Sequence, residues 1–323
     1  MNILLDFKKQ FDKEVNIYLD EKIKSAEKID KKGSDLFEII KEFINSGGKR
    51  LRPAIFYYAF LSYSSQNSAK VLKLSFIFEL FHSFALIHDD IIDNSDLRRR
   101  KLTVHKKYNL STAILAGDLA LMLADQIFTQ EINKLEIVNL YNEFKQELLI
   151  GEYLDTEKIN DINKIMELKT ARYSFIKPAI IALNFAQVNR QEAEKWKEIL
   201  NKTGILFQIK DDFDGTFGND KSLGKPTDSD IKEGKNTLLV KKFLAKSNSK
   251  EKEYFYSFFG KSNFEKEDLI WYKKTLVKYK IDNEIKEKII RESTEVENKL
   301  NHYFPGKILT QLMKEIFFKL RDF

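Results

Sequence analysis

The sequence contains no cysteine, which excludes disulfides, thiolate nucleophiles and metal sites built on cysteine. Only 4 prolines and 12 glycines interrupt its 323 residues, too few turn signals for a protein of many strands. No uninterrupted apolar run reaches the length of about 18 residues that favours a membrane-spanning helix, so no transmembrane segment is predicted. The amino-terminal stretch lacks an apolar core and a cleavage site and carries acids, so neither a signal nor a transit peptide is predicted. We therefore expect a cytoplasmic location.

The net charge of +6 raises the question of nucleic-acid binding, which the distribution of charge does not favour. Lys and Arg total 55 and are dispersed among 49 acids. The dense basic run from Arg98 to Lys101 directly follows a group of carboxylates. A solvated basic surface explains the excess, and a cationic cleft for small anionic substrates is the alternative. No nucleic-acid partner is predicted.

The hydrophobic residues, 43% of the chain, follow helical spacing. Phe7, Phe11, Val15 and Tyr18 recur at steps of four, four and three, which places them on one helix face. Residues 68–93 are apolar on almost all sides, as is typical of a helix inside a helical assembly. Further helices are predicted at about 111–133, 136–155, 161–185, 191–214, 235–245, 265–278, 282–302 and 307–321.

Two polar loops are predicted, one containing Asp228 and Asp230 and one at 247–249. The chain shows no internal repeat at a fixed period and no low-complexity linker. Residues 1–323 are therefore predicted to form one all-α domain, a single large helical bundle.

The first of two acidic clusters is formed by Asp89, Asp90 and Asp93, at the end of the apolar stretch. Asp89 and Asp93 are four residues apart, so their carboxylates project from the same helix face. Three acids at the carboxyl end of an apolar helix repel one another, resist desolvation and oppose the helix dipole. A hard divalent cation such as Mg²⁺ would offset this charge. A solvated acidic helix end is the alternative for one such cluster alone.

The second cluster, Asp211, Asp212 and Asp214, again follows an apolar helical run. Two acidic helix ends that are far apart in sequence can face each other across a helical bundle, and bundle cores build metal sites in this way. The pair of clusters therefore predicts a metal site more strongly than either cluster alone.

Cationic segments accompany the acids. Residues 47–53 read GGKRLRP, with two glycines directly before the basic residues. Glycine allows close backbone approach to a ligand, while Arg and Lys bind phosphate. Gly–Lys pairs recur at 224–225 and 234–235, and Lys169-Thr170 lies inside a predicted helix. Each Gly–Lys pair alone is also compatible with an ordinary loop, and Lys169-Thr170 with an ordinary helix surface.

Taken together, the chain resembles the trans-isoprenyl diphosphate synthase family, which includes the farnesyl and geranylgeranyl diphosphate synthases. The resemblance covers about residues 40–240 and rests on the order GGKRLRP, DDIID with RRR after it, KT, FQIKDD, GK and GK. It implies an all-α bundle around a central cavity and a Mg²⁺-dependent prenyltransferase. The enzyme would join an allylic diphosphate (dimethylallyl, geranyl or farnesyl) head-to-tail to isopentenyl diphosphate.

The resemblance also implies a role for each matching residue. Asp89 and Asp93 match the first aspartate-rich motif, with Asp90 supporting them, and Asp211 and Asp212 match the second. Three Mg²⁺ ions per site are expected with substrate bound. The residues matching the allylic diphosphate site are Arg98, Lys169, Lys225 and Lys235, and those matching the isopentenyl diphosphate site are Gly48, Lys49, Arg52, His82 and Arg99.

The resemblance further implies that Thr170, Gln208 and the Lys169 carbonyl face the developing allylic cation. Metal ions and cationic side chains would neutralise the departing pyrophosphate in a dry pocket. His82 lies two helical turns before Asp89 on the same face, so its place in the site is plausible from spacing alone. A satisfied core histidine is the alternative for His82.

Four departures from the family pattern stand out. Gly215 replaces the last acid of the second motif, and Asp214 lies about 100° round an ideal helix from that position. Arg100 and Leu102 replace the usual glycine and proline after the arginine pair, and Glu152 replaces a usual glutamine. None of these changes removes a leading metal ligand, so an active enzyme is predicted.

Product length rests on Phe84, five residues before the first motif, and on Phe81 one turn earlier. In the family, the residue five before the first aspartate motif often forms the floor of the product pocket. A bulky residue there limits the product to C15 or C20. Ala85 and the DDIID spacing resemble the geranylgeranyl type, so geranylgeranyl diphosphate is favoured and farnesyl diphosphate comes next. A phenylalanine that only fills the core is the alternative.

Other functions are weighed against this one. A medium- or long-chain polyprenyl synthase and a class I terpene cyclase are the alternatives, but a cyclase has no need of Lys49 and Arg52. Squalene- or phytoene-type synthases carry DxxxD pairs instead, and a helical adaptor leaves the clustered acids unexplained. The resemblance also implies a homodimer, for which apolar stretches such as 111–128 offer a surface.

Overall fold

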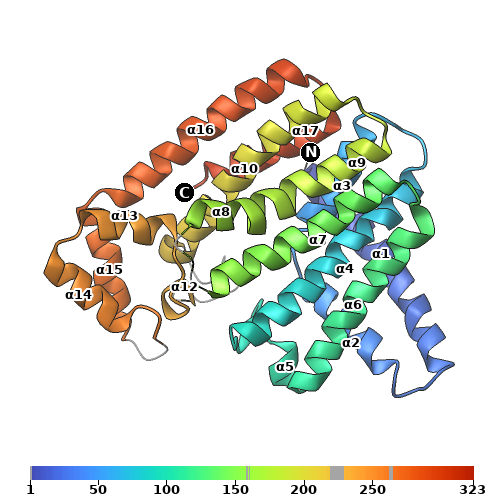
Figure 1. Ribbon diagram of the computed structural model, residues 1–323, viewed down its shortest axis with the longest axis horizontal. Coiled ribbons are helices and arrows are strands. Elements are labelled where there is room, and N and C mark those ends of the chain that lie inside the picture. The colour runs from blue at the N-terminus through green and yellow to red at the C-terminus, as the bar shows by residue number, and fades with distance from the viewer. Residues whose placement is uncertain (1, 158, 160, 219–228, 262–264) are drawn as a thin grey trace. The chain divides into compact units, whose positions relative to one another are not determined.

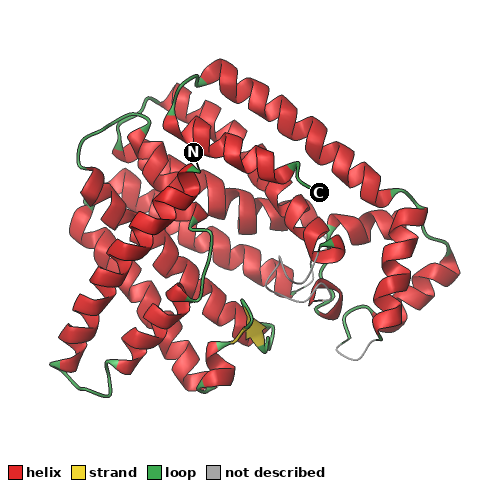
Figure 2. Ribbon diagram, turned by 180° about the vertical axis from the view of Figure 1, so that it is seen from behind, coloured by secondary structure: helices red, strands yellow, loops and turns green. Residues whose placement is uncertain are grey.

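The computed structural model describes residues 2–157, 159, 161–218, 229–261 and 265–323. Within these ranges the regular structure is helical apart from one two-stranded hairpin (Figure 2), so the predicted all-α fold class is confirmed. Contacts divide the chain into two compact units. Unit 1 holds Met1–Tyr141, Pro178–Ala193 and Gly306–Glu315, and unit 2 holds Asn142–Lys177, Glu194–Pro305 and Ile316–Phe323. The single domain stays a prediction.

The first elements of unit 1 are four helices, which are followed by the hairpin and then by two more helices. The elements are α1 (Ile3–Glu27), α2 (Asp35–Asn45), α3 (Leu51–Leu61), α4 (Ser68–Ile92), β1 (Leu97–Arg98), β2 (Lys101–Leu102), α5 (Val104–Lys107) and α6 (Leu110–Glu131). Four further helices belong partly to each unit: α7 (Leu135–Thr156), α9 (Lys177–Phe185), α10 (Arg190–Phe217) and α17 (Ile308–Leu320).

Helix α4 is buried on almost all sides, as the apolar stretch at 68–93 predicts. It packs against α3 and α6, and α6 runs beside it (Figure 1). Gly117 in α6 permits this close approach, because a Cβ there would lie 2.4 Å from Nε2 of His88 in α4. The apolar face predicted from Phe7, Phe11 and Val15 is buried in α1.

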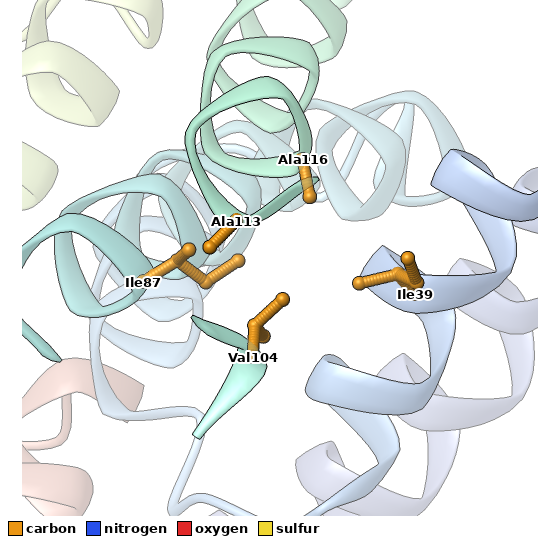
Figure 3. Packing of buried hydrophobic residues seen from close by; sticks show 5 residues of the cluster. All are labelled: Ile39, Ile87, Val104, Ala113 and Ala116. Carbon is orange, nitrogen blue, oxygen red and sulfur yellow. The ribbon is translucent and has the colours of Figure 1, made fainter. Parts of the chain in front are cut away.

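A smaller cluster of buried side chains joins four helices of unit 1. Ile39 of α2, Ile87 of α4, Val104 of α5, and Ala113 and Ala116 of α6 pack together (Figure 3). The two alanines leave room for the larger side chains that approach from the other helices, so this end of α6 contacts both α2 and α5.

Two helices of the described ranges, α4 and α6, are long and apolar enough to cross a membrane by length and composition alone. The most apolar window of α4 is 72% buried and that of α6 is 39% buried. A core helix passes the same test, so this is weak evidence for a membrane. The absence of a transmembrane segment stays a prediction.

Unit 2 contains helices of 4 to 23 residues and one π-helical segment. Its own elements are α8 (Ile162–Met166), the π-helix η1 (Glu167–Ile176), α12 (Ser229–Lys232), α13 (Leu238–Lys246), α14 (Ser249–Phe258), α15 (Lys266–Lys278) and α16 (Ile281–Tyr303). Gly204 of α10 lies against η1, where a Cβ would come within 2.5 Å of the Ala171 Cα. Only glycine therefore allows α10 to reach the η1 backbone. Aromatic rings of Phe243, Phe255 and Tyr272 join α13, α14 and α15.

Most predicted helices lie within a few residues of those observed. Helices α2, α3 and α5 and the hairpin were not predicted, and three further features differ. Helix α14 was not predicted; Asn248, placed in a loop by its polar neighbours, caps this helix through a reciprocal pair of hydrogen bonds with Glu251. Asp230, also predicted in a loop, lies in the short helix α12, while Asp228 lies outside the described residues. The predicted helix at 161–185 is continuous but changes to π-helical hydrogen bonding at η1.

Candidate active site

The first aspartate motif lies at the carboxyl end of α4 in unit 1, where Arg98 of the hairpin reaches it. Arg98 Nε donates to Asp90 Oδ1 at 2.8 Å, and Arg98 Nη2 donates to Asp89 Oδ2 at 3.2 Å. Burial raises the pKa of Asp90 to about 6, although Arg98 acts in the opposite direction. The structure therefore places one cation beside two of the three carboxylates predicted to bind metal. Asp93 caps the end of α4.

The donor set at this helix end fits Mg²⁺ chemically. Asp89 is a partly exposed carboxylate, and Asp90 Oδ2 is buried without a hydrogen-bond partner. Mg²⁺ commonly uses one or two protein carboxylates together with water and substrate phosphates, so a complete protein cage is not required. Within the described ranges, no group of three or more histidine or acidic side chains is arranged so that it could hold a metal ion.

The glycine loop before α3 is held from two sides in unit 1. Gly48 has φ +121°, and a Cβ there would lie 2.8 Å from Arg50 Nη1 and 2.9 Å from Arg99 Nη2. Arg99 of the hairpin donates to the Gly47 carbonyl and, at 3.3 Å, to Ser46 Oγ. The structure thus joins Arg99 to the loop that carries Lys49, and the substrate role assigned to both residues stays a prediction.

Arg50 is the residue of this loop that the sequence analysis did not assign. Its side chain is 1% exposed and its backbone is left-handed, with φ 54°. It donates to Asp12 Oδ1 at 2.7 Å and to Glu79 Oε1 at 2.5 Å. It also donates to the Gly47 and Ile44 carbonyls at 2.8 and 2.6 Å. Arg50 therefore fixes the glycine loop to α1, α2 and α4, and no sequence spacing points to these partners.

His82 lies near this group of arginines. Burial lowers its pKa well below the usual range, and the positive charges of Arg52, Arg99, Arg98 and Arg50 act in the same direction. The imidazole is therefore neutral at pH 7 and is able to act as both hydrogen-bond donor and acceptor. Lys49 is exposed at the surface of the loop.

Lys169 lies in η1 of unit 2 between two acids of α7. Its Nζ is 2.6 Å from Glu152 Oε2 and 2.6 Å from Asp155 Oδ2. Burial opposes the positive charge, but these carboxylates outweigh it and raise the pKa of Lys169. Gly151 makes the contact possible, because a Cβ there would lie 2.9 Å from Lys169 Cγ. Glu152, noted as a departure from the family pattern, thus contacts Lys169 directly, a residue predicted to bind the allylic diphosphate.

A chain of hydrogen bonds links the predicted catalytic residues of unit 2. Thr170 Oγ1 donates to Gln208 Oε1, and Gln208 Nε2 donates to Asp212 Oδ1 at 2.7 Å. The chain connects η1 to α10 and fixes the orientation of the Gln208 amide. Thr170 and Gln208, predicted to act together, are therefore in direct contact.

The second aspartate motif lies within α10, which continues to Phe217. Asp211 is exposed and Asp212 is buried. Asp214 accepts from Lys210 Nζ at 2.6 Å through both oxygens. Gly215 is buried, and a Cβ there would lie 2.7 Å from Asp230 Oδ2, so the Asp230 carboxylate occupies the space that a larger residue would need. A larger residue at position 215 would require the Asp230 carboxylate to move.

The remaining predicted residues divide as follows. Lys235 pairs with Glu233 in unit 2, and Lys225 lies outside the described residues. Phe81 and Phe84 are buried in α4 with ring centroids 5.4 Å apart, and Phe84 contacts the His88 ring at 4.7 Å. The first motif belongs to unit 1 and the second to unit 2, so their approach to each other stays a prediction, as do the roles of all these residues.

Comparison with known proteins identifies the family. A family profile described as polyprenyl synthetase matches residues 34–276. A geranylgeranyl diphosphate synthase of Sulfolobus acidocaldarius is 33% identical over 294 residues, which cover 86% of this chain and 88% of that protein. A short chain isoprenyl diphosphate synthase of Methanocaldococcus jannaschii is 32% identical over 268 residues, or 80% of each chain.

Solved structures agree in fold. Geranylgeranyl pyrophosphate synthase from Corynebacterium glutamicum, in complex with isoprenyl diphosphate and magnesium, superposes with a TM-score of 0.87 at 24% identity, covering 98% of both chains. The synthetase from Pyrococcus horikoshii gives 0.80 at 25% identity, again covering 98% of both chains. Catalysis in the family depends on Mg²⁺, and its members use isopentenyl and allylic diphosphates. The predicted family and enzyme class are confirmed: the chain belongs to the polyprenyl synthetase family of prenyltransferases.

Proposed function

We propose that this enzyme condenses isopentenyl diphosphate head-to-tail with an allylic diphosphate to give a short all-trans product, geranylgeranyl diphosphate first and farnesyl diphosphate next. The observation that carries the proposal is the 33% identity, over most of both chains, to a protein named geranylgeranyl diphosphate synthase. A farnesyl diphosphate synthase of Micrococcus luteus is 34% identical over a shorter stretch of 224 residues. Solanesyl synthases match at 26–27% identity, which leaves the long-chain alternative as second candidate.

The charges of the described residues support diphosphate binding. Arg98 lies beside Asp89 and Asp90, and Lys169 and Lys235 provide further cations in unit 2. Asp89, Asp93 and Asp211 would hold Mg²⁺, three ions per site with substrate present. When bound, Mg²⁺ neutralises the charge that builds on the departing pyrophosphate. Cationic side chains and fixed dipoles act on the same leaving group in a site from which water is excluded.

The allylic cation requires negative dipole ends rather than a nucleophilic side chain. Thr170 and Gln208 form one hydrogen-bonded unit with Asp212, so their oxygen atoms are held in fixed orientations. The double bond of isopentenyl diphosphate attacks the cation at C1, the new C–C bond forms, and a proton leaves to the released pyrophosphate. The neutral His82 and the loop bearing Lys49 and Arg52 would bind isopentenyl diphosphate.

We further propose a cytoplasmic homodimer. Support for the dimer comes from α6, whose large apolar side chains are exposed in the single chain, Leu115 at 55% and Met122 at 66%. An exposed apolar helix face of this kind is typical of a protein interface. The purified chain is therefore expected to elute at twice its mass of 38.0 kDa in size-exclusion chromatography with light scattering.

The proposal is tested by measuring incorporation of radiolabelled isopentenyl diphosphate with C5, C10 and C15 allylic primers, with and without Mg²⁺. A product that stops at C20 supports the proposal. Incorporation that requires Mg²⁺ distinguishes enzymatic turnover from background radiolabel. Products of C30 or longer favour the polyprenyl alternative. Conversion of an allylic diphosphate without consumption of isopentenyl diphosphate indicates a cyclase and contradicts the proposal.

Replacing Phe84 and Phe81 together with alanine is expected to lengthen the product by one or more C5 units. The two rings project from α4 and are in contact with each other, so their removal is expected to open space for a longer prenyl chain. The products are separated by reversed-phase thin-layer chromatography. Because the change costs stability of about 3–5 kcal/mol per large core side chain, each single variant is measured as well. An unchanged product distribution in folded variants rules out the pocket-floor assignment.

Replacing Glu152 with glutamine is expected to lower KM for the allylic diphosphate by about three- to tenfold with little change in kcat. Lys169 is held by two carboxylates, and removing one charge reduces the repulsion of an incoming diphosphate, an effect of about 1 kcal/mol at a partly exposed site. Glu157→Gln, at an exposed position close by, is the matched control and leaves KM unchanged. A KM that rises in Glu152→Gln contradicts this account of Lys169.

A further inference from the structure

A cavity of about 350 Å³ lies in unit 1 between α2, the hairpin and α5. Its apolar lining comes from Ile39, Phe43, Leu102 and Val104. Figure 3 shows the Ile39 and Val104 side chains directed toward each other from α2 and α5. Small-molecule sites in proteins commonly have this size and this combination of apolar walls with a few polar groups. The predicted reaction does not use the apolar residues of this cavity.

The polar groups around the cavity give it a positive charge. Three cations, Arg98, Lys101 and Lys107, face one carboxylate, that of Glu42. Both oxygens of Glu42 accept from Lys107 Nζ at 2.6 Å, and Arg98 is paired with the first aspartate motif. Lys101 forms no ion pair with any residue that the structure describes. Its ammonium group is therefore available to an acidic ligand.

The hairpin at the cavity carries two of the departures from the family pattern. Leu102 replaces the usual proline and lines the cavity while its side chain remains 56% exposed. Arg100 replaces the usual glycine but keeps the left-handed backbone that favours glycine, with φ 63°, and Arg99 before it has φ 52°. Strained backbone of this kind is concentrated at ligand clamps and active sites. Leu102 thus adds an apolar wall to the cavity, and Arg100 adds positive charge to the hairpin that carries Leu102.

We infer that this cavity binds an amphiphilic anion, with its apolar tail among Ile39, Phe43, Leu102 and Val104 and its acidic head at Lys101. A lysine ammonium group is a point charge and binds either a phosphate or a carboxylate head. Arg98 lines the cavity and also donates to Asp89 and Asp90, so an occupant contacts a side chain shared with the predicted metal motif. Apart from Arg98, none of the residues that line the cavity is assigned to a substrate site above.

The inference is tested by isothermal titration of the full chain with dodecyl phosphate below its critical micelle concentration. Saturable binding is expected, whereas inorganic phosphate, which has no tail, gives no saturable heat. Dodecanoate distinguishes the sources of such a ligand: tighter binding of dodecanoate indicates a fatty acid, and tighter binding of dodecyl phosphate indicates a phosphorylated lipid or prenyl compound. Absence of saturable binding for both overturns the inference.

Two variants locate the ligand. Leu102→Glu and Lys101→Glu change exposed side chains and are each expected to weaken binding by about tenfold. Lys28→Glu, which reverses an exposed charge at the end of α1, is the control and leaves binding unchanged. Circular dichroism verifies that each variant is folded. Undiminished binding in both cavity variants together with loss in Asp89→Ala places the ligand at the aspartate motif and overturns the inference. None of these readouts depends on turnover, so a failure of the proposed function leaves them interpretable.

Discussion

Replacing Asp89 with alanine is expected to abolish turnover of isopentenyl diphosphate, a loss of at least about three orders of magnitude. Asp89 stands in the last turn of α4, where its carboxylate accepts from Arg98 Nη2 at 3.2 Å. The substitution removes the leading carboxylate of the predicted first metal motif and leaves Arg98 bound to Asp90 alone. The readout is the initial rate of radiolabel incorporation with an allylic co-substrate at saturating Mg²⁺.

The control for this variant is Asp96→Ala. Asp96 is an exposed acid just before the hairpin that pairs with Lys106 at 3.0 Å, so its loss is expected to leave turnover close to that of the wild type. Substrate analogues are expected to bind Asp89→Ala weakly, since the cationic side chains of the site remain. A folded Asp89→Ala enzyme with near-normal turnover would refute the metal assignment.

Replacing Arg50 with methionine is expected to lower the free energy of unfolding by about 3–5 kcal/mol. Arg50 is buried with Glu79, which is 4% exposed, and donates to it and to Asp12. Removing the guanidinium leaves the Glu79 carboxylate without its closest cation and frees the Gly47 and Ile44 carbonyls. The measurement is the urea midpoint, together with KM for isopentenyl diphosphate, which is expected to rise because the loop bearing Lys49 loses its anchor.

Two further variants distinguish the stability cost of losing a buried cation from the cost of losing an exposed one. Lys41→Met breaks the partly exposed pair between Lys41 and Asp20 and is expected to cost less than about 1 kcal/mol. Adding Glu79→Gln to Arg50→Met is expected to restore part of the stability, because the uncompensated charge is removed. A cost for Arg50→Met no larger than that for Lys41→Met contradicts the anchoring role of Arg50.

Helical spacing gave most of the helices because the apolar period is a local property of the sequence. The stretch at 68–93 becomes α4, and 111–133 and 282–302 become α6 and α16. Two of the differences, at α14 and η1, occur where the apolar period is weak. Helix α14 begins at a capping box rather than an apolar face, and η1 changes hydrogen-bond spacing in response to its neighbours.

The candidate site was predicted in part. The motif residues Asp89, Asp90 and Arg98 are in contact within unit 1, and Thr170, Gln208 and Asp212 are in contact within unit 2. The functions assigned to them rest on the family and stay predictions. The approach of the two aspartate motifs also stays a prediction.

Sequence alone determined the family, the all-α class and the residues that carry charge, because motifs and the hydrophobic period are local properties of short segments. Only the tertiary structure decided which charges pair: Arg50 with Asp12 and Glu79, and Lys169 with Glu152. It also placed Asp230 against Gly215 and Leu102 in the wall of a cavity. Such contacts join residues that are distant along the chain, and a buried charge finds its partner through packing and desolvation, which no local pattern records.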